Sequence, residues 1–433
     1  MSDNNWVDSI PNNWNLVRFS KAYNFSRGLD IKKHDLSDHG LPVISYGQIH
    51  AKDNPGVHIS RSHIRYIPEE FVKESQIERA LLNEGDIVFA DTSEDIEGAG
   101  NMVRATGESA LYAGYHTLIA RPSPGFHHEY MAYQMLSTLW RQQIQRSVQG
   151  VKVYSITQRI FNDVTILQPT DEEQQEIGEF LASMTAEIDG LVDRMAREVQ
   201  LLERYRRELI ARTVTRGLDP NTPMRDSGID WIAEVPAAWK TTTISIVTDE
   251  NKARNTDLSE KNLLSLSYGR IIRKDIDLAF GLLPASFDSY QIVEPGYIVL
   301  RMTDLQNDKR SLRSALVNER GIITSAYIGL KVRGPISSGY FAWLLRFYDL
   351  AKVFYSLGGG VRQSANYKEI GKIPILVPSI AEQQNIADFL EEKSAQIDLT
   401  IAHINRQIDL LSKYRKQVIN DTVTGKVRVG EVA

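Results

Sequence analysis

The sequence has 433 residues, of which 42% are hydrophobic and 24% charged, and a formal net charge of −5. This length is too great for one ordinary domain and suits two or three, while the acidic balance counts mildly against a stand-alone nucleic-acid binder. The absence of cysteine excludes disulfides and thiolate metal sites. Because the sequence has neither a signal-peptide pattern nor an apolar run of about 18 residues, we expect a cytoplasmic protein.

Residues 1–170 predict a first globular unit built from short strands. Ile44–Ile49 and Tyr115–Ile119 are strand-like runs, the first of them broken by a glycine turn, and Asn83–Phe89 predicts a turn that leads into a buried strand. Glu129–Arg146 predicts a short helix that follows these strands.

Residues 171–216 predict one long helix. Apolar side chains recur mostly at steps of three and four residues from Ile177 to Leu209, a repeat of about 3.5 that keeps one face toward a partner helix. A helix of about 40 residues is near 60 Å long. Burial of such a helix in one large core is the alternative, but its charged outer face favours two helices packed mainly on each other.

Residues 217–378 begin with a connector rich in proline, glycine and polar residues, and then repeat the first unit. The entry Trp231–Trp239 (WIAEVPAAW) corresponds to Trp6–Trp14 (WVDSIPNNW). The other corresponding segments are a strand-like run with a glycine turn at Leu266–Ile271, a turn and buried strand at Glu294–Leu300, a strand at Tyr327–Val332 and a helix at Gly339–Leu357.

Residues 379–425 repeat the long helix without a gap, shifted by about 209 residues as from Glu173 to Glu382, and residues 426–433 form a C-terminal tail. We expect an α+β fold in which two globular units of mixed α and β structure alternate with two long helices. The helices are expected to pack as an antiparallel coiled coil, which gives the chain an internal pseudo-twofold repeat.

The sequence contains no convincing catalytic motif. An Asn/Asp-Pro-Pro-aromatic turn and a Pro-Cys nucleophile, which DNA methyltransferases need, are both missing, as is a Gly-x-x-x-x-Gly-Lys-Ser/Thr phosphate loop. We therefore expect no catalytic residues, no metal site and no cofactor on this chain.

Polar and basic loops in both globular units carry residue types that contact DNA. Arginine and lysine bind phosphates or guanine, glutamine suits adenine, and aromatic rings pack on sugars or bases. The candidates are Arg61, His63, Arg65, Lys152, Tyr154, Gln158 and Arg159 in the first unit, and Lys309, Arg310, Arg313, Arg362, Gln363 and Tyr367 in the second. Each alone is typical of solvated surface, but the recurrence of a Gly-Val-Lys/Arg loop in both halves favours a binding role.

Two features of the sequence resemble the conserved regions of the specificity subunit of type I restriction-modification systems. One is the pair of helices that open with Glu-Gln-Gln and close with Tyr-Arg-Arg or Tyr-Arg-Lys, and the other is the entry from Asp226 to Trp239. The resemblance covers essentially the whole chain. It implies two target recognition domains, one per globular unit, each binding one half of a split asymmetric DNA sequence, with the helices holding them at a fixed separation.

The resemblance also implies partners. These are double-stranded DNA, modification (methyltransferase) subunits, of which we expect two, and restriction (motor and nuclease) subunits that attach through them. S-adenosylmethionine, ATP and Mg then belong to those subunits, which carry adenine methylation and ATP-dependent cleavage. The residues expected to pair the helices and dock subunits are Ile177, Leu181, Ile188, Leu202, Tyr205, Ile386, Leu390, Ile397, Leu411 and Tyr414.

Two other functions stay open at this point. A stand-alone DNA methyltransferase or nuclease would show activity without added subunits. A coiled-coil scaffold would use its long helices but bind no DNA.

Overall fold

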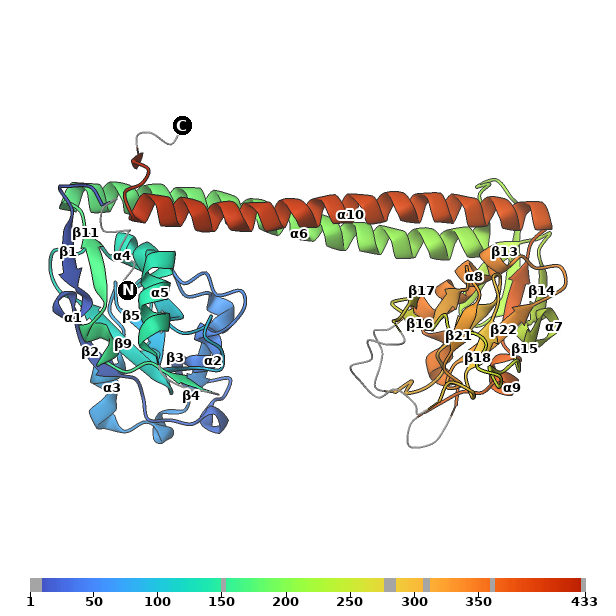
Figure 1. The fold of residues 1–433 in the computed structure, drawn as a ribbon, viewed down its shortest axis with the longest axis horizontal. Coiled ribbons are helices and arrows are strands. Elements are labelled where there is room, and N and C mark those ends of the chain that lie inside the picture. Colours follow the sequence, from blue (N-terminus) through green and yellow to red (C-terminus); the bar gives the residue numbers. More distant parts are fainter. Residues whose placement is uncertain (1–9, 149–152, 276–285, 307–311, 359–362, 430–433) are drawn as a thin grey trace. The chain divides into compact units, whose positions relative to one another are not determined.

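A computed structural model describes residues 10–148, 153–275, 286–306, 312–358 and 363–429. The chain divides into two compact units, unit 1 with Met1–Met195 and Arg406–Ala433, and unit 2 with Ala196–Asn405. Each unit contains one globular domain and part of both long helices, α6 (Asp171–Arg216) and α10 (Ile380–Val423), which Figure 1 shows in green and red. The prediction of two helices of about 40 residues is confirmed, since α6 has 46 residues and α10 has 44.

The globular domain of unit 1 is built on an antiparallel sheet of four strands in the order β2-β9-β5-β7. Strands β4, β3 and β8 form a second sheet, and β1 pairs with β11 and β6 with β10. The strands of unit 1 are β1 (Asn15–Arg18), β2 (Tyr23–Arg27), β3 (Leu41–Ile44), β4 (Arg65–Ile67), β5 (Ile87–Ala90), β6 (Thr92–Ser93), β7 (Met102–Arg104), β8 (Tyr112–Ala113), β9 (Thr117–Pro122), β10 (Tyr154–Ser155) and β11 (Thr165–Gln168).

The short helices of unit 1 are α1 (Phe19–Ala22), α2 (Tyr46–Ile49), α3 (Glu74–Ala80), α4 (His128–Leu136) and α5 (Thr138–Ser147). The prediction of one helix from Glu129 to Arg146 is wrong, because Ser137 has an extended backbone and its hydroxyl accepts a hydrogen bond from the amide of Trp140, which starts a second helix. Helix α4 lies between the sheet and the long helices (Figure 1), and its Tyr130 and Met131 share one buried core with Phe89 and Leu181.

Unit 2 repeats this arrangement. Its antiparallel sheet has the order β15-β22-β19-β20, and β14 pairs with β23 as β1 does with β11. The strands of unit 2 are β12 (Met224–Ile229), β13 (Ile232–Pro236), β14 (Lys240–Thr243), β15 (Thr248–Glu250), β16 (Leu264–Ser267), β17 (Arg270–Arg273), β18 (Gln291–Val293), β19 (Ile298–Leu300), β20 (Ser314–Leu316), β21 (Gly321–Ile323), β22 (Ile328–Val332) and β23 (Pro374–Val377). Its short helices are α7 (Ile244–Val247), α8 (Ser338–Leu350) and α9 (Tyr367–Ile370).

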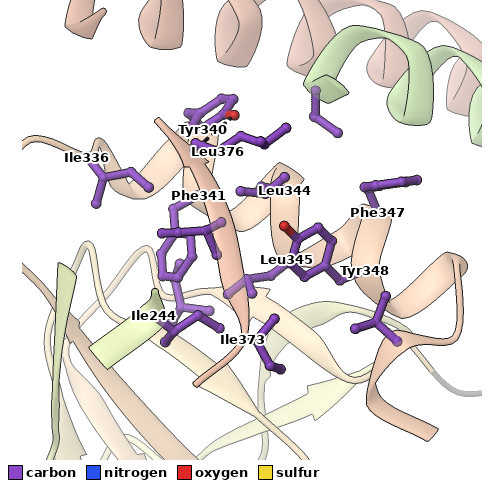
Figure 2. Packing of buried hydrophobic residues seen from close by; sticks show 14 of the residues in the cluster. Ile244, Ile336, Tyr340, Phe341, Leu344, Leu345, Phe347, Tyr348, Ile373 and Leu376 are labelled. Carbon is purple, nitrogen blue, oxygen red and sulfur yellow. Dashed lines mark hydrogen bonds between the residues drawn. The ribbon is translucent and has the colours of Figure 1, made fainter. Parts of the chain in front are cut away.

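Helix α8 is the centre of the core of unit 2. Tyr340 and Phe347 lie toward the long helices in Figure 2, whereas Phe341 lies toward the sheet. The predicted helix from Gly339 to Leu357 ends early, at Leu350, because Lys352 has a left-handed backbone with φ of 63°. The core therefore stacks sheet, short helix and long helix in each unit, which positions the globular domain on its part of the helix pair.

A strand with a glycine turn is predicted at both Ile44–Ile49 and Leu266–Ile271, and the structure confirms it only in unit 2. In unit 2, β16, a turn and β17 occupy the corresponding run. In unit 1, β3 ends at Ile44, and the next residues form α2, at whose start the side chain of Gln48 accepts a hydrogen bond from the amide of Ser45 (3.1 Å). The buried strands expected near Phe89 and Leu300 are present, and so are the strands expected near Ile119 and Val332.

Candidate functional site

A buried glutamine ties the start of each long helix to the start of the short helix beneath it. The side chain of Gln174 accepts a hydrogen bond from the amide of His127 (2.9 Å) and donates to the carbonyl of the proline before α6 (3.1 Å). Gln383 accepts from the amide of Ser337 (2.7 Å) and donates to the proline before α10 (2.9 Å). Both glutamines are completely buried. The repeated Glu-Gln-Gln therefore marks a structural joint between domain and helix.

The tryptophan-rich entries also end at the starts of the long helices. The indole of Trp239 donates to Glu382 (3.0 Å), and Asn13, next to Trp14, donates to Glu173 (3.2 Å). Burial acts to raise the pKa of Glu173, but the hydrogen bonds that its carboxylate accepts, first from the amide of Thr170, hold the pKa below its ordinary value.

Two aspartate–arginine ion pairs join the long helices, one in each unit. In unit 1, Arg415 of α10 binds Asp189 of α6 through two hydrogen bonds of 2.9 and 3.1 Å. In unit 2, Arg206 of α6 binds Asp398 of α10 at 2.6 Å. These aspartates and arginines are identical between the two sequence repeats, so each repeat contributes its acid to one pair and its arginine to the other.

Most of the predicted helix residues are shielded from solvent. Those that are buried are Ile177, Leu181 and Ile188 in unit 1 and Ile386, Leu390 and Ile397 in unit 2, and Leu202 and Leu411 are half-buried. Tyr205 and Tyr414, in contrast, are 53% and 45% exposed. The apolar repeat therefore includes two tyrosines that the helices leave on the surface.

The first group of predicted DNA-contact residues in unit 1 is mixed. The side chain of Arg61 is 93% exposed and lies 4.0 Å from a carboxylate oxygen of Glu108. Arg65 is also exposed. His63 is buried, and its Nε2 lies 3.0 Å from a carboxylate oxygen of Asp53. The imidazole of His63 therefore braces its own loop, and the two arginines carry the available positive charge.

The second group in unit 1 begins next to β6, which is followed by the acidic residues Glu94, Asp95 and Glu97. Tyr154 is half-buried in β10, where it pairs with Ser93 of β6, and Gln158 and Arg159 are exposed. Lys152 lies outside the described residues.

In unit 2 the structure contradicts one prediction. Arg313 is fully buried, and its guanidinium donates to the backbone carbonyls of Arg301 (3.1 Å), Thr303 (2.8 Å) and Asp304 (3.1 Å). Its amide donates to the buried carboxylate of Asp349, whose pKa is raised by burial. Arg313 holds β20 on α8, so it cannot reach a phosphate or a base in this structure.

The side chains of two other candidates in unit 2 already donate hydrogen bonds to backbone carbonyls. Gln363 donates to the carbonyls of Tyr355 (3.1 Å) and Leu357 (2.7 Å), and the hydroxyl of Tyr367 donates to the carbonyl of Thr248 (2.8 Å). Tyr367 also lines a polar cavity of about 530 Å³, at which Arg254 is exposed. The remaining candidates, Lys309, Arg310 and Arg362, lie outside the described residues.

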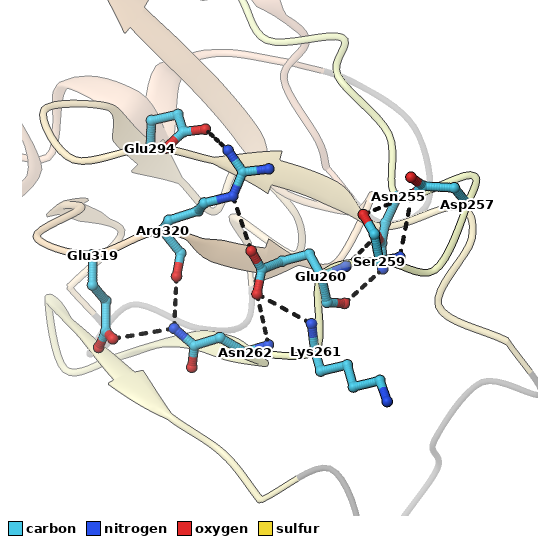
Figure 3. A network of polar contacts seen from close by, with 9 residues as sticks. All are labelled: Asn255, Asp257, Ser259, Glu260, Lys261, Asn262, Glu294, Glu319 and Arg320. Atoms are coloured by element: carbon cyan, nitrogen blue, oxygen red, sulfur yellow. Dashed lines mark hydrogen bonds and ion pairs between the residues drawn. The ribbon is translucent and has the colours of Figure 1, made fainter.

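A polar network braces one face of unit 2 (Figure 3). The guanidinium of Arg320 binds both Glu260, at 3.0 Å, and Glu294. Hydrogen bonds from the amides of Asn262 and Lys261, together with Arg320, outweigh burial and lower the pKa of Glu260. Arg320 is therefore held between two acids and fixes the loop before β16.

The most exposed aromatic side chain among the described residues is not among the predicted site residues. Tyr268, in the turn between β16 and β17, is 85% exposed and has a φ of 44°. Its signal was the dipeptide Tyr-Gly at a two-residue turn, where asparagine is the usual first residue.

Comparison with known proteins gives consistent matches. A protein-family model described as "Type I restriction modification DNA specificity domain" matches residues 24–192 and 325–410. The type I restriction enzyme StySPI specificity subunit of Salmonella potsdam is 26% identical over 224 residues, which are 50% of this chain and 46% of that protein. The type I restriction enzyme MjaVIII specificity subunit of Methanocaldococcus jannaschii is 20% identical over 436 residues, covering 97% of this chain and 94% of that protein.

A solved structure shares the fold along almost the whole chain. The matched structure comes from a study of the assembly and conformational transition of the type I R-M system, and it aligns with a TM-score of 0.64 at 14% identity. The match covers 96% of this chain and 99% of that chain. Within the described residues, no helix is both long and apolar enough to cross a membrane.

Proposed function

We propose a function from one premise: the chain belongs to the type I restriction modification DNA specificity family, whose model matches more than half of its residues. It is the subunit that recognises DNA in a type I restriction-modification complex. The observation that carries this assignment is the family match, together with full-length specificity subunits of similar sequence.

Each globular domain, in this proposal, reads one half of a split asymmetric DNA target. Support comes from the exposed cations Arg61, Arg65 and Arg159 in unit 1 and Arg254 in unit 2, because such side chains can bind phosphates without first losing a buried partner. Lys152, Tyr154, Gln158, Lys309, Arg310, Arg362, Gln363 and Tyr367 remain proposed DNA contacts, and Arg313 and His63 do not.

The long helices, we further propose, pack as an antiparallel coiled coil within an internal pseudo-twofold repeat. The ion pairs Asp189–Arg415 and Asp398–Arg206 support antiparallel pairing. From the first pair to the second, the residue number rises from 189 to 206 on α6 and falls from 415 to 398 on α10. The exposed Tyr205 and Tyr414 are then the surface on which two modification subunits dock.

Catalysis belongs, in this scheme, to the partner subunits. Adenine methylation would use S-adenosylmethionine on the modification subunits, and ATP and Mg would serve cleavage on the restriction subunits. The protein would work in the cytoplasm, where genomic DNA is accessible to the assembled complex.

Co-expression with the modification subunits tests the proposal. We expect the assembled complex to select one bipartite sequence from a pool of random duplexes, with salt-sensitive affinity, and the chain alone to bind weakly. Assembly without any sequence selection would instead favour the scaffold function, and methylation by the isolated chain would favour a stand-alone enzyme.

A further inference from the structure

The hairpin β16–β17 ends in a turn whose sequence is not the one that its backbone prefers. Tyr268 and Gly269 form a two-residue turn, with Ser267 opposite Arg270, and their φ angles are 44° and 72°. Turns with two positive φ angles favour asparagine or aspartate followed by glycine. Tyr268 is 85% exposed, so burial of its ring does not compensate for the backbone conformation. A strained residue kept at an exposed tip is typical of a functional position.

Two contacts hold this tip in place. Arg346 of α8 donates to the carbonyl of Gly269 and, at 2.9 Å, to a carbonyl of β20. Arg270 pairs with Asp398 of α10, the same carboxylate that binds Arg206 of α6. The turn is therefore attached to the helices of unit 2, and a ligand that binds it does not have to order a free loop.

The hairpin is also basic. The hairpin, residues 264–273, includes Arg270 and Arg273 and no acidic residue. The side chains of Arg270 and Arg273 are 72% and 73% exposed, although each is paired with an acid. An exposed aromatic ring among cations suits a polyanion that also presents flat or apolar surfaces, and nucleic acid is such a ligand.

Unit 1 uses the corresponding residues differently. Tyr46 is followed by glycine, as Tyr268 is, but it lies in α2, half-buried, with its ring 4.7 Å from that of His50. The exposed tyrosine is therefore specific to unit 2, as a residue that reads only one half of a target would be.

We propose that Tyr268 contacts double-stranded DNA, packing its ring against sugars and base edges of the half-site that unit 2 reads. The hairpin β16–β17 is the element that carries this ring to the DNA. The inference rests on the proposed function, because it concerns the DNA that a specificity subunit recognises.

The test uses the full chain assembled with its modification subunits and the duplex that the wild-type complex selects from a random pool. Tyr268→Asn suits the turn backbone and removes the ring, so we expect its Tm to be no lower than that of the wild type. Its Kd for the selected duplex should rise about tenfold, equivalent to about 1.4 kcal/mol. The dependence of Kd on salt should not change, since no cation is removed. Tyr268→Phe should bind within about twofold of the wild type.

The matched control is Leu258→Asn. Leu258 is also exposed (48%), has a left-handed backbone (φ 55°) and lies in unit 2, within the loop that the network of Figure 3 braces. We expect the control variant to bind DNA as the wild type does. If Tyr268→Asn binds equally well, or if it weakens subunit assembly and not DNA binding, the inference is wrong.

A second measurement does not depend on the stability of these variants. A photoreactive benzophenone side chain introduced at position 268 should crosslink to the duplex, whereas the same group at position 258 should not. Crosslinking from position 268 to a protein subunit alone would overturn the inference. If the wild-type complex selects no duplex at all, the proposed function fails, and that failure is distinct from the loss caused by Tyr268→Asn.

Discussion

The globular domains of units 1 and 2 are attached to the long helices by equivalent contacts but have different surfaces. Gln174 and Gln383 both accept from the amide before the short helix and donate to the proline before the long helix, and Gln383 also donates to the carbonyl of Pro335. The hydroxyls of Tyr130 and Tyr340 both donate to a carbonyl of the last strand before the long helix. The four-stranded sheets have the same order. The shared contacts are local to the joint between domain and helix, which is therefore the part of the repeat that both halves preserve.

The two units differ at positions away from this joint. Tyr46 begins a helix in unit 1, whereas Tyr268 occupies a hairpin turn in unit 2. Arg313 is sealed inside unit 2, whereas Arg61 is almost fully exposed in unit 1. Residue type alone therefore does not identify a DNA contact here, because arginine is a buried structural residue in one unit and a surface residue in the other.

The largest expected effect comes from Arg313→Met. This change removes three hydrogen bonds from the buried guanidinium to backbone carbonyls, whereas the hydrogen bond from the amide of residue 313 to Asp349 remains, so we expect unit 2 to lose about 3–5 kcal/mol of stability. Denaturant unfolding should show it. Arg61→Met, the control in unit 1, should change stability by less than about 0.5 kcal/mol but weaken DNA binding. Equal stability of the two variants would contradict the structural role of Arg313.

A smaller effect is expected at the repeated joint. Gln174→Ala and Gln383→Ala each leave a buried amide without its acceptor, so each should cost about 2–3 kcal/mol. Gln175→Ala is the matched control, since Gln175 is exposed and its side chain bonds only within α6, to Glu179 (2.8 Å). Hydrogen exchange should increase at the start of α4 in the first variant and of α8 in the second. Identical exchange in Gln174→Ala and Gln175→Ala would remove the joint from the explanation of the repeat.

The exposed tyrosines of the helices should have matching effects on assembly. Tyr205→Ser and Tyr414→Ser should each weaken binding of a modification subunit by about tenfold, or about 1.4 kcal/mol, without lowering Tm. Calorimetric titration measures both, and Tyr66→Ser, an exposed tyrosine (38%) of β4, is the control. A loss at only one of the two tyrosines would mean that the two docking surfaces are not equivalent.

The smallest effect distinguishes the units by pH. Burial lowers the pKa of His128, the first residue of α4, more than nearby Glu84 raises it, and the corresponding residue of α8 is Ser338. Because the unfolded chain binds the proton more tightly, this stability is present above the ordinary pKa of about 6.5 and is lost as pH falls through the lowered folded value.

His128→Asn should therefore reduce the loss of stability of unit 1 between about pH 7 and 5.5, by less than about 1 kcal/mol. The pH dependence of the stability of unit 2 should not change. Tm values measured across this range check the prediction, and an unchanged slope in His128→Asn would show that other groups, such as His58, dominate the acid response.

Local patterns predicted the parts of this protein that depend on neighbouring residues in the chain. The 3- and 4-residue steps from Ile177 to Leu209 indicated a long helix, and α6 spans that run. The buried strands at Ile87–Ala90 and Ile298–Leu300 followed from apolar runs after glycine turns. The identical Glu-Gln-Gln segments indicated a repeat, although their role as a joint was visible only with the partner amides in place.

The long helices, the repeat and the family resemblance could be predicted from the residues, because each depends on periodicity or identity along the chain. Which polar residues face solvent could not be predicted, because it depends on the folded arrangement of the strands and helices. Arg313 and Arg61 have the same chemistry, and Tyr46 and Tyr268 have the same following glycine, yet Arg313 is buried and Tyr46 half-buried, whereas Arg61 and Tyr268 are exposed. Burial depends on strands and helices that are distant in sequence, such as β20 and α8 around Arg313, and no local pattern contains that information.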